Sequence, residues 1–224
     1  MQQRRSMDEV PAYFSELGRL RMLGDDAALD FANTRHWRDG REIDFLTGYP
    51  ALLGWAVVAR LLSQDEHDRL KAAEGDMPLR AADVFSAAIR LRDIWKIYLA
   101  EATRTELPSA PLDQPLEALR RMVTKALGSP GLAIAGLPTD ALSGAEMALP
   151  LARAALAIGA FLALPHAGTL RMCEADPCGG VFLDTSRSQK RRWCAMDSCG
   201  NRVKAQRHRL RMKAEAVEPP KSKG

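Results

Sequence analysis

The sequence predicts a mainly α-helical chain with a minor β contribution (α+β), in which a helical N-terminal domain precedes a small cysteine-containing module. Apolar residues recur at intervals of three and four through much of the first 165 residues, as on one face of a helix. All four cysteines lie between Cys173 and Cys199. The composition changes at residues 166–168, beyond which lysine and arginine become dense. These three features place two unlike folding units in one chain.

Start signals locate the first helices of the N-terminal domain. Pro50 favours a first helical turn, Ser63 and Glu66 form a capping-box pattern, and Pro78 opens a long segment. The apolar residues of that segment recur at helical spacing: Val84, Ala88, Leu91, Trp95 and Tyr98. Residues 23–35 mix apolar residues with turn formers, so we expect a short strand or a helical turn there.

Proline and glycine divide the second half of this domain. Residues 107–115 contain three prolines and are expected to form a linker, followed by a helix over 116–127. A short strand is expected within 131–137. A second capping-box pattern then begins an apolar helix over 143–164, which we expect to be kinked at Pro150.

The net charge of +4 is distributed unevenly along the chain. Residues 1–170 carry 19 basic and 22 acidic side chains, whereas residues 171–224 carry 13 basic and 6 acidic ones. A basic end on a mildly acidic domain is typical of proteins that bind nucleic acid. We therefore divide the chain into a helical domain (1–166) with a sensing or dimerising role, a cysteine module (167–214) and a frayed tail (215–224).

No segment of the sequence is expected to cross a membrane. The longest uncharged apolar stretch, Ala154 to Pro165, has twelve residues, which is too short for a spanning helix. The first ten residues contain two arginines but no apolar run, so we expect no secretory signal and a cytoplasmic location. Met7, like Met1, is a candidate start.

The cysteines have the spacing of a metal site, with Cys173 and Cys178 as one close pair and Cys194 and Cys199 as the other. Zinc prefers four tetrahedral ligands, and four thiolates satisfy it. In a reducing cytoplasm, this grouping favours one structural zinc over two disulfides. A catalytic zinc is disfavoured because four thiolates leave no open position for water.

The residues between the two cysteine pairs predict a hairpin that brings the pairs together. Gly179 and Gly180 permit a sharp turn, and residues 181–183 and 191–193 are expected to pair as strands. A helix is expected over about 200–214, so the order is knuckle, hairpin and helix, as in a treble-clef finger. With few apolar residues, this module needs the metal to fold, and we expect loss of one cysteine to unfold it while sparing the larger domain.

Positive charge is concentrated around the second cysteine pair. Between Arg187 and Lys213 there are ten basic residues, and Asp197 is the single acid. Some of these arginines, Arg202 first, are expected to neutralise the negative zinc–thiolate centre. The others exceed what that centre needs, and like charges repel along a helix, so a polyanionic partner is expected. Val203 and Leu210 lie on one stripe and should dock the helix on the hairpin.

The cysteine module resembles the CGNR zinc-finger family, named for the stretch at residues 199–202. The matching residues are Cys173, Cys178-Gly179, Phe182-Leu183-Asp184-Thr185-Ser186, Arg191-Arg192-Trp193-Cys194, Met196, Cys199-Gly200-Asn201-Arg202 and Lys204. Residues 29–34 (LDFANT) resemble the start of the ABATE domain, which precedes this finger in many bacterial proteins. The resemblance implies a stress-induced bacterial transcription regulator whose finger binds DNA. Gly180 departs from the pattern, in which a larger residue, often tryptophan, is expected.

The chemistry of the side chains assigns roles within the module. The expected zinc ligands are Cys173, Cys178, Cys194 and Cys199. The expected contacts to double-stranded DNA are Arg187, Lys190, Arg191 and Arg192 from the loop and Arg202, Lys204, Arg207, His208 and Arg211 from the helix. Asn201 is expected to fix the helix start or the hairpin by backbone hydrogen bonds rather than to read a base. Gly200 is expected to allow either close packing or an unusual backbone angle.

Other readings remain open. Asp30, Asn33, Arg35 and His36 could line a pocket for a small-molecule effector or, with less support, for an enzyme substrate, although such residues more often cap turns and pair on the surface. RNA binding is disfavoured because the aromatic residues of the module, Phe182 and Trp193, look like core rather than stacking platforms. A protein-interaction finger would expose apolar rather than basic residues. A single finger gives little affinity, so a homodimer is expected.

Overall fold

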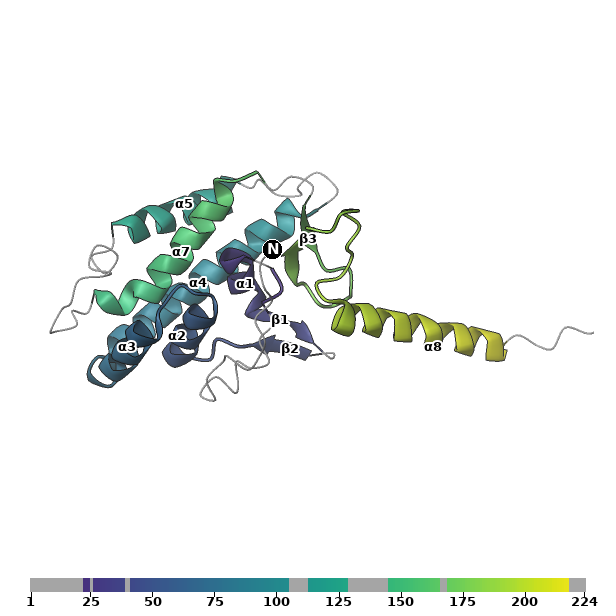
Figure 1. The fold of residues 1–224 in the computed structure, drawn as a ribbon, viewed down its shortest axis with the longest axis horizontal. Coiled ribbons are helices and arrows are strands. Elements are labelled where there is room, and N and C mark those ends of the chain that lie inside the picture. Colours follow the sequence, from purple (N-terminus) through teal and green to yellow (C-terminus); the bar gives the residue numbers. More distant parts are fainter. Residues whose placement is uncertain are drawn as a thin grey trace, which may run out of the picture.

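The structure is a computed structural model, which describes residues 22–24, 26–38, 41–104, 113–128, 145–165 and 169–217. Helices gather on one side of the molecule, short strands lie beside them, and the last helix projects away from both (Figure 1). The described strands form two two-stranded sheets. We call the described residues up to 165 the body and residues 169–217 the finger. The predicted mainly helical fold with a minor β contribution is confirmed.

The body consists of helices joined by short connections. Their bounds are α1 (Ala27–Asn33), α2 (Tyr49–Val58), α3 (Gln64–Asp76), α4 (Pro78–Ala102), α5 (Asp113–Leu127) and α7 (Leu149–Leu162). The start signals are confirmed: Pro50 lies in the first turn of α2, Pro78 begins α4, and Ser63 and Glu66 form a capping box before α3. These signals act locally, so the sequence shows them directly.

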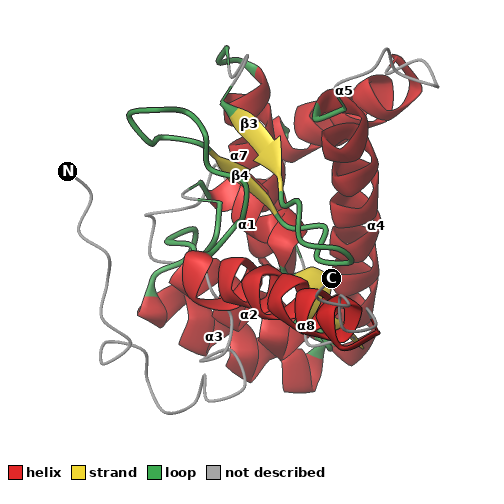
Figure 2. Ribbon diagram, turned by 90° about the vertical axis from the view of Figure 1, so that its right-hand side faces the viewer, coloured by secondary structure: helices red, strands yellow, loops and turns green. Residues whose placement is uncertain are grey.

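The long helix α4 stands upright along the right-hand side of the view in Figure 2, and it contacts α1, α2, α3, α5 and α7. Its residues Ala88, Leu91 and Trp95 are completely buried, as their helical spacing predicted. Trp95 donates a 2.7 Å hydrogen bond from Nε1 to the carbonyl of Ala28, and its ring meets Phe161 edge-on at 5.6 Å. One side chain thereby joins α4 to α1 and α7.

Of the two alternatives expected within residues 23–35, the helical one is confirmed: residues 27–33 form α1, because Asp26 caps this segment by accepting the Ala28 N–H at 2.8 Å. The strands β1 (Arg35–Arg38) and β2 (Arg41–Asp44) follow it. Two other local expectations are wrong. Pro150 does not kink a helix but lies in the first turn of α7, where its missing N–H costs nothing, after a 3₁₀ turn at Glu146–Ala148. Helix α5 begins inside the predicted linker. The strand predicted at 131–137 lies outside the described residues.

In the finger, β3 (Leu170–Met172) pairs antiparallel with β4 (Val181–Leu183), with Arg171 opposite Phe182. The predicted partner of β4, residues 191–193, does not form a strand. We call residues 173–180, which connect β3 to β4, the knuckle loop. A π-helical turn at Met196–Gly200 leads into α8 (Asn201–Val217), which continues beyond the predicted end near residue 214.

The finger packs directly on the body. The side chain of Val181 belongs to the body core, and Asn33 forms two hydrogen bonds with the Val181 backbone, to its C=O at 2.8 Å and from its N–H at 2.9 Å. The Trp37 N–H donates to the carbonyl of Cys178 at 3.1 Å. The knuckle loop and β4 are therefore held by α1 and β1.

Candidate metal centre and cationic surface

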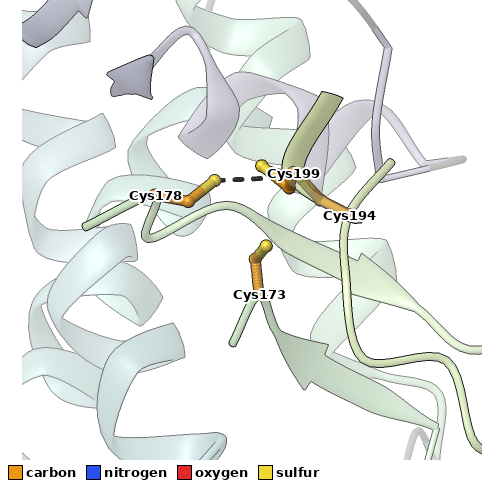
Figure 3. A group of neighbouring side chains, drawn as sticks. All are labelled: Cys173, Cys178, Cys194 and Cys199. Carbon is orange, nitrogen blue, oxygen red and sulfur yellow. Dashed lines mark hydrogen bonds between the residues drawn. The ribbon is translucent and has the colours of Figure 1, made fainter. Parts of the chain in front are cut away.

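The four cysteines converge on one point. Their sulfur atoms all lie within 4.8 Å of one another, and all four residues are buried. Figure 3 shows the side chains pointing toward a common centre, from the end of β3, the knuckle loop, the following loop and the turn before α8. Four sulfurs at this spacing match the donor set and the coordination number that zinc prefers.

The backbone of the knuckle loop is shaped to hold these sulfurs. Gly179 has a φ of +65°, which residues other than glycine rarely adopt, so a glycine at this position allows the chain to turn. A Cβ at Gly180 would lie 3.4 Å from Cys178 Sγ and 3.5 Å from Cys194 Sγ. The departure at Gly180 therefore lies against the sulfur cluster, and a larger residue there would have to extend past it.

The electrostatics of the cluster demand a cation. Cys194 Sγ lies 3.7 Å from both Cys178 Sγ and Cys199 Sγ. The interactions among the four thiols lower the pKa of Cys173 and raise the pKa values of Cys178 and Cys194. Four thiolates this close repel one another, so they can all ionise only around a positive ion. A dication such as zinc satisfies this requirement.

Two of the predicted DNA-contacting arginines lie at this centre instead. Arg202 donates from Nη2 toward Cys199 Sγ at 3.8 Å and to the carbonyl of Ala175 at 3.4 Å. Arg191 lies over the Phe182 ring at 4.3 Å and donates to the carbonyls of Trp193 and Cys194. Their positive charges therefore offset the zinc–thiolate centre and brace the loop, as expected for Arg202.

The loop between β4 and Cys194 is organised by a buried carboxylate. Asp184 accepts hydrogen bonds from the N–H and hydroxyl of Ser186 and from the N–H of Arg191. Burial alone would raise the pKa of Asp184, but these hydrogen bonds outweigh it, and the pKa is lowered. Arg187 and Lys190 are exposed on this loop, whereas Arg192 forms an ion pair with Glu174 at 2.5 Å.

Helix α8 contacts the finger through its first turns. Val203 is half-buried there, but Leu210 is 60% exposed and Met212 is 49% exposed, so the predicted docking along the whole stripe is wrong. A Cβ at Gly200 would come within 3.3 Å of the Trp193 ring, which confirms the close packing expected of this glycine. Asn201 donates to the carbonyl of Asp197 at 3.4 Å, a backbone contact of the kind expected at the helix start.

The remaining predicted DNA contacts on α8 are all exposed: Lys204, Arg207, His208 and Arg211. Helix α8, which carries them, extends beyond the finger (Figure 1). The structure therefore presents their charge on a projecting helix.

The four residues predicted to line a pocket have separate positions. Asp30 accepts the Gly24 N–H at 2.8 Å, Asn33 holds Val181, and Arg35 pairs with Glu42 at 2.9 Å. His36 Nδ1 lies 2.8 Å from the carbonyl of Asn33. His36 also lines a cavity between the body and the knuckle loop. The hydrogen bonds between Asn33 and Val181 could not be predicted from the sequence, because the two residues are 148 positions apart.

Comparison with known families agrees with this architecture. Residues 169–212 match the CGNR zinc finger, and residues 25–163 match ABATE, described as "Putative stress-induced transcription regulator". The chain belongs to the ABATE family. Its CGNR finger and buried cysteine cluster together assign one structural zinc, held by Cys173, Cys178, Cys194 and Cys199. None of the curated proteins compared with this ABATE-family chain matches it. Among its described residues, no helix is long and apolar enough to span a bilayer.

Proposed function

We propose that this protein is a cytoplasmic transcription regulator that binds double-stranded DNA through α8 and the adjoining loop of its zinc finger. The observation that carries the proposal is the position of α8: the helix extends from the metal centre, and its described side chains from Lys204 to Lys213 are exposed. Five of those side chains are lysine or arginine, and none is acidic. Such a helix has little to stabilise it unless an anionic partner surrounds it.

The arrangement of charge on α8 fits a groove. At about 100° per residue, Arg209 and Lys213 fall on one edge of the helix, while Lys204, Arg207 and Arg211 fall on the opposite edge. A helix in the major groove has a phosphate backbone on each side, and its width of about 10–12 Å matches a groove about 12 Å wide. Two cationic edges therefore favour insertion into a groove over contact with one strand.

The finger offers little for RNA recognition by stacking. Phe182 is completely buried, and Trp193 is half-buried with the Arg192 guanidinium 5.4 Å from its ring centre. Single-stranded RNA is usually read by exposed aromatic rings, so duplex DNA is the better partner. The proposal contains no catalytic step, because four thiolates fill the coordination shell of the zinc.

Salt dependence tests the proposal. Binding of the zinc-loaded protein to duplex DNA should fall with salt, with a log–log slope of about −4 to −7 if about five to eight phosphates are neutralised. The double variant Arg207→Gln/Arg211→Gln should flatten the slope by about 2 units. Arg120→Gln/Arg121→Gln, on the exposed face of α5, removes the same charge and should leave the slope unchanged. A flat slope for the parent protein rejects DNA binding.

A second experiment separates a regulator from a non-specific binder. Selection from random duplexes should enrich a site with two related half-sites if the protein acts as the expected homodimer. Enrichment of no sequence, with the salt slope intact, would leave DNA binding in place and reject sequence-specific regulation.

A further inference from the structure

We propose that the cavity between the body and the knuckle loop binds a small organic monoacid, a molecule with one carboxylate and a hydrocarbon part. The proposal concerns a site about which the family descriptions say nothing, and it does not depend on DNA binding. It rests on three features of the cavity: its size, an ammonium group in its wall, and the apolar residues around that group.

The cavity has a volume of about 320 Å³. Residues of α1, β1 and α4 form one wall, and Pro177, Cys178 and Gly179 of the knuckle loop form another. One water molecule occupies about 30 Å³ in the liquid, and at that volume per non-hydrogen atom the cavity accommodates a ligand of roughly ten non-hydrogen atoms. This size lies at the lower end of small-molecule sites.

The ammonium group of Lys96 lacks an anionic partner. Its Nζ donates to the carbonyl of Arg35 at 2.5 Å and toward the carbonyl of Ala32 at 3.5 Å. Both acceptors are neutral, and among the described residues no carboxylate lies within ion-pair distance of this nitrogen. Since an ammonium has three N–H donors, one remains for a ligand.

The surroundings of Lys96 favour an anion. Burial lowers the pKa of Lys96, and the positive charges of Arg92 and Arg35 lower it further. Arg92 pairs with Asp44, and Arg35 pairs with Glu42. Asp93 also lies 3.5 Å from Arg35 and 3.7 Å from Arg92, so among the described residues Lys96 is the one cation of these three that contacts no carboxylate. A ligand carboxylate beside it would supply the missing counter-charge.

The rest of the lining selects a molecule with a single charge. Leu99 is buried, Ala100 is half-buried and Trp37 is 39% exposed, so together they provide an apolar wall for a hydrocarbon part. Glu42 also lines the cavity, with its carboxylate on Arg35. A second carboxylate on the ligand would approach Glu42 and be repelled, which disfavours diacids.

Calorimetry on the zinc-loaded full chain tests the site, with benzoate and hexanoate as probes and benzamide as the uncharged match of benzoate. We expect at least one acid to bind with a dissociation constant below about 1 mM, and benzamide at least about tenfold more weakly. Absence of binding by both acids overturns the proposal. Equal binding of benzoate and benzamide also overturns it, because the ammonium would then have no role.

Variants locate the binding. Lys96→Met should abolish acid binding, and Ala100→Phe should abolish it by filling the cavity from α4 while keeping Lys96 in place. Lys125→Met, an exposed position on α5, is the matched control and should bind as the parent does. If Lys96→Met does not fold, Ala100→Phe decides the question. Acid binding that survives in the folded variants overturns the assignment to this cavity.

Discussion

At Asn33, one side-chain amide joins the two parts of the protein. Its amide donates one hydrogen bond to the Val181 carbonyl and accepts one from the Val181 N–H, as the backbone of a neighbouring strand would do. Because Asn33 and Val181 are both buried, water cannot replace either hydrogen bond without opening the contact. This residue therefore fixes where β4, which follows the knuckle loop, sits on α1.

Asn33→Ala should lower the free energy of unfolding of the zinc-loaded protein by roughly 2 to 4 kcal/mol, because it leaves a buried N–H and a buried C=O unpaired. Denaturant unfolding measures the change. The matched control is Asn201→Ala, whose exposed amide makes one long hydrogen bond, and it should cost less than about 0.5 kcal/mol. Equal stability of the two variants would mean that Asn33 does not hold the finger.

Asp184 has a comparable role inside the finger, since three donors converge on its carboxylate. Asp184→Asn would set an amide N–H₂ against one of those donors, which we expect to cost about 1–3 kcal/mol and to loosen the loop that leads to Cys194. Zinc should then transfer faster to a coloured chelator. Ser188→Ala, at an exposed position in the same loop, should release zinc at the parent rate, and an unchanged rate in Asp184→Asn would contradict the proposed bracing.

At the scale of elements, the sequence predicts what local chemistry decides. Caps and first-turn prolines placed α2, α3 and α4, and cysteine spacing alone identified the four residues that converge. Expectations were wrong where the structure of a segment depends on a partner that is distant in the sequence. Strand β4 pairs with β3, which precedes the first cysteine pair, and no periodicity in residues 191–193 could exclude them as its partner.

Helix α8 shows the same limit. The seven-residue spacing of Val203 and Leu210 predicted a docked stripe, yet the finger is too small to reach Leu210. Spacing reports which residues share a face, but it does not report whether another element exists to cover that face. The basic residues beyond the first turns thus extend away from the metal centre (Figure 1).

Projection of α8 predicts its dynamics. In the free protein, amides from Lys204 to Lys213 should exchange with solvent much faster than those of the buried helix α4, because a short helix without packing is marginally stable. Duplex DNA should slow exchange in α8 and leave α4 unchanged, as mass spectrometry can measure. Protection of α8 before DNA is added, or none after it, would contradict the proposed role of the helix.

At the scale of the whole molecule, the finger and the body pack against each other, although the sequence predicts two separate folding units. Val181 lies in the body core, and the knuckle loop also receives the Trp37 N–H through the carbonyl of Cys178. If the metal orders that loop, metal binding should also stabilise the surface on which α1 and β1 pack. From these contacts we therefore expect loss of the finger to destabilise the body, against the independence that the sequence alone suggested.

Zinc removal tests this coupling. Stripping the metal with a strong chelator should unfold the finger, whose core is too small to stand without it, and should also lower the melting temperature of the body. Hydrogen exchange should increase in α1 and β1, which contact the finger, and stay unchanged in α3, which lies away from it (Figure 1). Cys194→Ser should reproduce both effects without a chelator, and restored zinc should reverse them in the parent but not in the variant. If the body melts at the same temperature with and without zinc, the two parts are energetically independent despite the contacts of Asn33 and Val181.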